Sequence, residues 1–203
     1  MQITIDKKTG VLLAIITLLL AALVSLGINR GDRDGFMGMD HHGSNNQHNS
    51  RSSDYTGADI MFLQMMIPHH QQAIDISNLA MKTSKDAELL ALAKIIARDQ
   101  ASEITKMKAW LADAGAGMDA GHSMDGMGGM LSGAELSALN VETGTKFDIL
   151  WLKGMTGHHD GAIHMTTMIR DASNPEIKAF GEKVIADQSA QIEQMREMIK
   201  RLS

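Results

Sequence analysis

Two stretches of this chain repeat one another, and the repeat restricts the folds that the chain can adopt. Residues 66–74 read MIPHHQQAI and residues 155–163 read MTGHHDGAI, so that Met, two His, Ala and Ile recur at an offset of 89 residues. An Asp-Gln pair at 99–100 likewise recurs at 187–188, at an offset of 88. The sequence therefore contains an internal duplication, and each half should form the same structural unit.

Each half has the apolar periodicity of two α-helices joined by a polar break. Ser132 and Glu135 stand at capping-box spacing and predict a short helix over 134–140 between the halves. The long helices are expected from 54 or 56 to about 81, from 86 to 112, from about 145 to 171, and from 175 to about 202. Two hairpins with matching apolar stripes predict an all-α protein built as a four-helix bundle.

The first thirty residues have the character of a membrane segment. Lys7 and Lys8 precede an uncharged run from Val11 to Ile28, which as a helix would span about 27 Å, close to the hydrocarbon core of a bilayer. The run is longer than a typical signal-peptide core, and the two lysines should keep the N-terminus in the cytoplasm. We expect residues 1–29 to be an uncleaved anchor in the bacterial inner membrane, single-pass, with the C-terminal domain in the periplasm or cell exterior. The alternatives are a signal segment cleaved to release the protein into the periplasm, and a buried core helix.

The composition excludes several classes of protein. The chain has no Cys, which rules out disulfides, thiolate zinc sites and iron–sulfur clusters. Its formal charge of −5 lacks the positive excess that nucleic-acid binding requires. The sulfur atoms of the chain belong instead to 17 Met residues, so an abundance of thioether groups is the unusual feature of the sequence.

The apolar face of the repeated helices also carries ionisable side chains. Asp59 and His70 share this face with large apolar residues, as do their counterparts Asp148 and His159. Burying such groups without partners costs a few kcal/mol each, so a hydrogen-bond network or a metal ion must satisfy them. The inward rows expected on the other two helices are Leu92, Ile96, Gln100, Glu103 and Met107, and Phe180, Val184, Gln188, Gln191 and Met195.

A Met followed by His at i+3 and i+4 places a thioether and two imidazoles at neighbouring positions on one helix. This pattern makes six residues candidate metal ligands: Met66, His69, His70, Met155, His158 and His159. Three further donors are expected in the second half, namely His164, Met168 and the adjacent Met165. The methionines expected to fill the core instead are Met61, Met65, Met107, Met195 and Met198. For the histidines, the alternative is a hydrogen-bonded core layer without metal.

Other Met and His residues lie in polar, Gly-rich segments where core packing cannot use them. Residues 30–53 are expected to form a flexible tether that carries Met37, Met39, His41 and His42. Residues 115–133 separate a first hairpin (54–114) from a second (134–203) and carry Met118, His122, Met124, Met127 and Met130. Thioether sulfur prefers Cu(I) and, by the same softness, Ag(I), while imidazole extends the range to Cu(II). The alternative for these segments is a low-complexity spacer.

The segments 62–74 and 154–163 resemble the paired M-x-x-H-H signatures of the family called domain of unknown function 305, and the similarity covers roughly residues 54–202. The resemblance implies a ferritin-like four-helix bundle, since that family is similar to such bundles. Its better-understood members are exported copper-binding proteins linked to copper resistance. The ligands that the resemblance implies are Met66, His69, His70, Met155, His158 and His159. Gln72 stands where the family usually has Gly after the first His-His-Gln.

Together these features predict an exported, membrane-tethered metal-binding protein, not an enzyme. It would sequester or relay copper, with Cu(I) favoured over Ag(I) or Cu(II), in copper homeostasis or resistance, and a copper-handling protein could be its partner. One alternative is a di-iron oxidase or ferroxidase, but no Glu of the chain is followed by His at i+3, as that class requires. The other is a metal-free helical interaction module.

Overall fold

The structure, a computed structural model, describes residues 54–118 and 128–203. These residues form the α-helices α2 (Gly57–Thr83), α3 (Ala87–Asp113), α4 (Gly133–Val141), α5 (Gly144–Met165) and α6 (Pro175–Leu202), with a 3-10 helix, η2 (Thr166–Ile169), after α5. The prediction of an all-α protein is confirmed. The expected membrane segment 1–29 and tether 30–53 lie outside the described residues. Within those residues, no helix has the length and apolar character needed to cross a membrane.

Side-chain caps determine where most of these helices begin. Thr56 and Asp59 form a capping box at the start of α2, and Asp86 accepts a hydrogen bond from the Leu89 amide at the start of α3. The predicted box of Ser132 and Glu135 begins α4. Of the two predicted beginnings of α2, 56 is correct to within one residue and 54 is not, and the predicted beginnings of α3 at 86 and α4 at 134 are correct to within one residue.

The predicted end of the third long helix at residue 171 is wrong. The α-helix ends at Met165, and the chain continues as a 3-10 turn. The hydroxyls of Thr166 and Thr167 donate to the carbonyls of Ile163 and His164, three residues earlier, and this i to i−3 pairing accompanies the tighter winding. His164 and Met168 therefore do not lie one turn apart on a single α-helical face.

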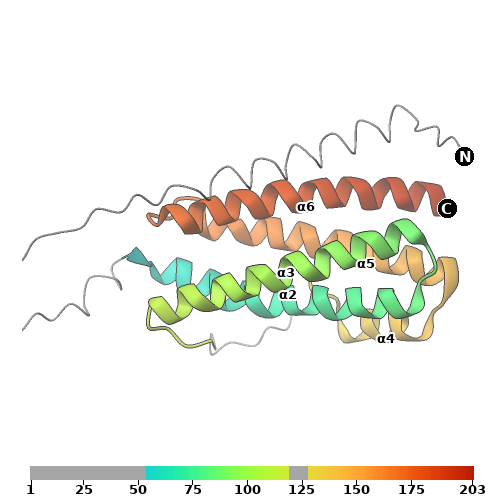
Figure 1. Cartoon of the computed structure of the whole chain (residues 1–203), viewed down its shortest axis with the longest axis horizontal. Helices are drawn as coiled ribbons and strands as arrows, with labels where there is room; N and C mark the ends of the chain where they lie inside the picture. Colours follow the sequence, from blue (N-terminus) through green and yellow to red (C-terminus); the bar gives the residue numbers. More distant parts are fainter. Residues whose placement is uncertain (1–53, 119–127) are drawn as a thin grey trace, which may run out of the picture. The chain divides into compact units, whose positions relative to one another are not determined.

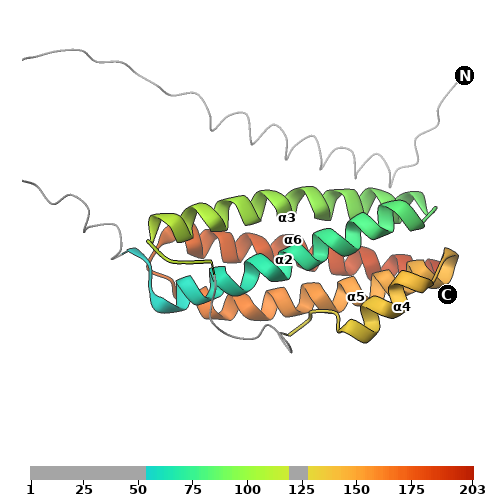
Figure 2. The same ribbon diagram turned by 90° about the horizontal axis from the view of Figure 1, so that it is seen from below.

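The four long helices lie side by side in both views (Figures 1 and 2), and the short α4 packs against α5. Between α2 and α5, the Trp151 indole nitrogen donates to the Ile76 carbonyl at 3.0 Å. Between α3 and α6, Arg201 forms an ion pair with Asp86 at 2.9 Å. Neighbouring helices thus run in opposite directions, in the cyclic order α2, α3, α6, α5.

The duplicated halves are related by a local two-fold axis. Because α2 and α5 are antiparallel, only one level along them can bring a residue against its own repeat counterpart, and that level is His69 with His158. On the opposite side, the repeated Asp-Gln pairs 99–100 and 187–188 line one small cavity between α3 and α6. The axis therefore passes between the first histidines of the motif and between the two glutamines.

The apolar core consists of two clusters that share none of their buried residues. One contains Trp151, Leu92 and Met195, and the other contains Phe62 and Phe180. On each long helix, residues of the two clusters are separated by one polar position or more. Those buried polar positions are His69, His70, Gln100, His158, His159 and Gln188, which we call the polar layer.

The methionines predicted to fill the core do so with one exception. Met107, Met195 and Met198 are buried, and Met65 is half-buried against the second cluster. Met61 is 44% exposed, so its assignment to the core is wrong. Its position on α2 lies outside the buried stripe that contains Phe62 and Met66.

The chain segment 128–131, which precedes α4, packs against both α2 and α5. The Gln72 amide donates to the Leu131 carbonyl at 3.0 Å and accepts from the Leu131 amide at 2.8 Å. On α5, a Cβ atom added to Gly161 would stand 2.0 Å from the Gly128 carbonyl oxygen. Gln72 and Gly161 occupy equivalent repeat positions, so one position holds the segment by hydrogen bonds and the other admits it by having no side chain.

Replacing Gly161 by Ala should destabilise the fold by about 1–3 kcal/mol, because the added methyl would overlap backbone atoms that cannot rotate away. Gly157→Ala is the matched control on the same helix, since nothing lies within 4 Å of its Cβ position. There Ala should stabilise the helix by about 0.5–1 kcal/mol. Urea unfolding measures both changes. Equal stability of the two variants would contradict the close packing of Gly128 on α5.

Candidate metal centre

The histidines of both repeated motifs lie in the middle of the bundle. His69, His70, His158 and His159 each have no exposed surface, and neither do Met66 and Met155, the methionines that precede them by one turn. The helical spacing that the sequence predicts brings each thioether onto the same helix face as its imidazoles. All six candidate ligands of the two motifs are therefore buried in or beside the polar layer.

The two histidines on the local axis contact each other directly. The rings of His69 and His158 have centroids 3.7 Å apart and are tilted by 36°. His158 Nε2 lies 3.0 Å from the His69 carbonyl oxygen. Because a carbonyl only accepts hydrogen bonds, this nitrogen carries the proton, and Nδ1 of His158 is the ring atom with a free lone pair.

The second histidine of each motif contacts a polar side chain on the neighbouring helix. His70 Nε2 lies 2.9 Å from Glu103 Oε2 on α3, and His159 Nε2 lies 2.6 Å from Gln191 Oε1 on α6. Sequence periodicity placed both partners on inward rows, but these pairings depend on the register between helices. In each contact the side-chain oxygen accepts a hydrogen bond from Nε2–H, which leaves Nδ1 as the unprotonated ring atom.

Several buried ring nitrogens have no hydrogen-bond partner among the described residues. They are Nδ1 of His70, His158 and His159, and both ring nitrogens of His69, although the Gly128 carbonyl lies near the His69 ring. A buried acceptor without a partner costs roughly 1–3 kcal/mol. Such lone pairs are the atoms that an imidazole offers to a metal ion.

Burial keeps three of these histidines neutral well below neutral pH. Loss of hydration, followed by repulsion from His70, lowers the pKa of His69 to about 3. Burial likewise lowers the pKa of His159 to about 4 and lowers the pKa of His158 strongly, with further repulsion from His69. Neutral imidazole is the metal-binding form, so protons do not compete for these rings at ordinary pH.

The carboxylate beside His70 is held in its ionised form. Burial raises the pKa of Glu103, but the hydrogen bond that it accepts from His70 and the contact with the Lys183 ammonium outweigh burial, and the net pKa is lowered. Lys183 Nζ lies 3.2 Å from the second Glu103 oxygen, at the surface. Glu103 thus joins the buried layer to a surface lysine.

The donor types of the polar layer fit a soft or borderline ion better than a hard one. No three His, Asp or Glu side chains of the described part of the chain converge closely enough to hold a metal ion. A site here would therefore have to draw on the thioethers of Met66 and Met155 as well as on imidazole. Thioether and imidazole together suit copper and silver.

The other predicted ligands lie apart from the polar layer or outside the described residues. His164 is exposed and Met168 is half-buried near the end of α5. Met118 is 50% exposed, and Met130 is half-buried within the segment 128–131, whose Leu131 is bound by Gln72. The candidate ligands outside the described residues are Met37, Met39, His41, His42, His122, Met124 and Met127.

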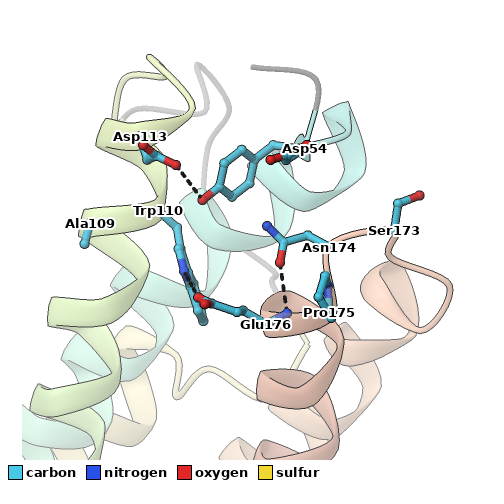
Figure 3. Close-up of a pocket in the computed structure, with 9 residues that line it drawn as sticks. Asp54, Ala109, Trp110, Asp113, Ser173, Asn174, Pro175 and Glu176 are labelled. Carbon is cyan, nitrogen blue, oxygen red and sulfur yellow. Dashed lines mark hydrogen bonds between the residues drawn. The ribbon is translucent and has the colours of Figure 1, made fainter. Parts of the chain in front are cut away.

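A larger cavity, of about 610 Å³, lies at the end of the bundle where α2 and α6 begin and α3 ends (Figure 3). Tyr55 and Trp110 line it, and their polar atoms donate to Asp113 at 3.2 Å and to Glu176 at 3.1 Å. Its donors are carboxylate and hydroxyl oxygens without sulfur or imidazole. It is therefore chemically distinct from the polar layer and does not match the thioether pattern of the sequence.

The metal-free chain should lose stability as the pH falls from about 6.5 to about 4. The unfolded chain binds protons at its histidines near pH 6.5, whereas the folded chain keeps His69, His158 and His159 neutral. For each of these three rings, the free energy of unfolding should therefore fall by about 1.4 kcal/mol per pH unit across this window. Urea unfolding at several pH values measures the slope. His159→Gln should reduce it, while a substitution of the exposed His164 should not. A stability independent of pH in this window would contradict the burial of neutral imidazoles.

Comparison with known proteins agrees with this architecture. The family model described as domain of unknown function (DUF305) matches residues 59–199. A DUF305 protein of Streptomyces coelicolor has a similar structure, with 27% identity and a TM-score of 0.68 over 71% of this chain and 93% of its own. A DUF305 fragment from Deinococcus radiodurans gives 28% identity and a TM-score of 0.68 over 72% and 97%. Among curated proteins, none matches.

The protein CopM is also similar. Its Cu(II)-bound form has 33% identity and a TM-score of 0.60 over 71% of this chain and 97% of its own. CopM is also known in Cu(I)-bound, silver-bound and apo forms. Because the family model matches residues 59–199, which cover most of both hairpins, the chain belongs to the DUF305 family.

Proposed function

We propose that this protein binds copper as its cargo, with Cu(I) preferred, Ag(I) accepted by the same soft donors, and Cu(II) accepted through imidazole. The observation that carries the proposal is the polar layer, in which buried imidazoles with unpartnered Nδ1 atoms lie one helical turn from buried thioethers. The similarity to CopM, which is known with Cu(I), Cu(II) and silver bound, supports a metal-binding role at the level of the family.

The histidines of the polar layer and the methionines beside it would bind and hold the ion. Met66 with His69 and His70, and Met155 with His158 and His159, would supply neutral donors that need no deprotonation at ordinary pH. The apolar clusters on either side would exclude water and competing ligands. Filling the layer would also remove the cost of the unpartnered nitrogens, so binding and folding should stabilise each other.

The Met and His residues outside the polar layer would capture the ion first. In this proposal Met118 and Met130, with His122, Met124 and Met127, form one set of weaker donors, and Met37, Met39, His41 and His42 form another. Exposure of Met118 agrees with such a role. His164 and Met168 would add donors near the end of α5.

The cellular setting is also part of the proposal. We infer that residues 1–29 anchor the protein in the bacterial inner membrane, or direct its export, so that the helices act in the periplasm or outside the cell. There the protein would sequester copper or relay it to a copper-handling partner, in copper homeostasis or resistance, without catalysing a reaction. A ferritin-like bundle would supply the frame.

Anaerobic titration with Cu(I) against a chromophoric competitor tests the proposal. The variant His70→Gln/His159→Gln should bind Cu(I) at least about tenfold more weakly, because it removes one imidazole from each half. Glutamine keeps a polar group in the layer, and circular dichroism verifies the fold. Met61→Leu is the matched control, since Met61 is exposed and belongs to neither motif.

A second variant separates the polar layer from the linker. Replacing Met118, Met124, Met127 and Met130 by Leu should reduce the number of weakly held ions and leave the tightest one. If the linker variant loses the tightest ion and the layer variant keeps it, the assignment to the polar layer is wrong. If the folded wild-type chain takes up neither Cu(I) nor Ag(I), the layer is a metal-free hydrogen-bonded core.

A further inference from the structure

The two halves of the polar layer differ at one functional contact. His70 and His159 are repeat counterparts, and each presents Nε2 to a side chain from the neighbouring helix. Those side chains, Glu103 and Gln191, are also counterparts, at the offset of 88 residues. In one half the acceptor is a carboxylate, and in the other it is an amide of the same length.

Each contact determines which ring nitrogen can bind a metal ion. An Nε2–H that donates to Glu103 or to Gln191 leaves the lone pair of the neutral ring on Nδ1. In both rings Nδ1 is buried and has no hydrogen-bond partner among the residues that the structure describes. The neighbouring helix therefore selects the ligand atom without itself contacting the ion.

The carboxylate and the amide should not have the same effect on the donor strength of Nδ1. Glu103 carries a negative charge only partly offset by Lys183, whose side chain is 56% exposed and also contacts Asp187. A charged acceptor polarises the N–H bond more strongly and makes the ring a better electron donor. Stronger donation and a nearby negative charge favour a divalent over a monovalent ion.

We propose, in an inference that rests on the proposed function, that Glu103 and Gln191 are positioning residues that present Nδ1 of His70 and His159 as ligand atoms. Because one is a carboxylate and the other an amide, they make the metal preferences of the two halves unequal. The half with His70 and Glu103 favours Cu(II). The half with His159 and Gln191 favours Cu(I) and Ag(I). The duplicated layer thus holds two versions of one imidazole site that differ in the preferred oxidation state.

Nitrogen NMR of the full wild-type chain, labelled with 15N, tests the ligand atom. In the metal-free protein, His70 and His159 should both be the Nε2–H tautomer. On addition of Ag(I), Nδ1 should shift and Nε2 should keep its proton. An Nδ1–H tautomer in either ring, or silver bound at Nε2, would overturn the inference while leaving metal binding by the layer intact. No shift at any of the four histidines would overturn both.

Reciprocal variants test the inequality of the halves. Glu103→Gln should lower the affinity for Cu(II) about 10–100-fold and that for Cu(I) by a smaller factor. Gln191→Glu should raise the affinity for Cu(II) relative to Cu(I). The substitutions change one atom type at constant length, and the NMR experiment on the wild-type chain is independent of whether the variants fold. Equal changes for both oxidation states would show that Glu103 has only a structural role.

Discussion

The burial of four imidazoles between two apolar clusters is the interaction on which the rest of this structure depends. Hydration of the rings is lost, and the compensating contacts come from three of the four long helices: a carbonyl on α2, Glu103 on α3 and Gln191 on α6. A helix displaced along its axis by one turn would separate these pairs and bury polar groups against Leu and Phe. The polar layer therefore defines the register of the bundle, a role that buried polar groups also have in coiled coils.

The duplication explains both the symmetry of the layer and its departures from symmetry. Antiparallel crossing of equivalent helices places His69 against His158, so the motif meets itself across the local axis. The linker, however, is present once. The equivalent positions Gln72 and Gly161 consequently serve the same segment in different ways, by hydrogen bonds on α2 and by close backbone approach on α5. Duplication followed by divergence around a single linker gives the two halves different chemistry.

Local sequence signals predicted the helices and their buried faces well. The caps at Thr56, Asp86 and Ser132 act within one turn of the chain, and the 3.6-residue periodicity placed His70 and His159 inside. Contacts between helices could not be predicted, because they depend on register, which is a property of the packed bundle. The pairing of His70 with Glu103 and the exposure of Met61 are of this kind. The early end of α5 at Met165, where the hydroxyls of Thr166 and Thr167 donate to carbonyls three residues earlier, was not predicted from the apolar periodicity. Gln72 stands where the family usually has Gly, but its hydrogen bonds to Leu131 were not predicted from the sequence.

The chain has two tryptophans, and the polar layer places them in different environments. Trp151 belongs to the cluster with Leu92 and is fully buried, and its indole N–H donates a hydrogen bond to a main-chain carbonyl. Trp110 belongs to the other cluster and is 8% exposed, and its indole N–H donates a hydrogen bond to a carboxylate. Each indole is thus an intrinsic fluorophore for one side of the bundle. Emission from single-tryptophan versions would show whether the two sides melt as one cooperative unit or separately across the histidines.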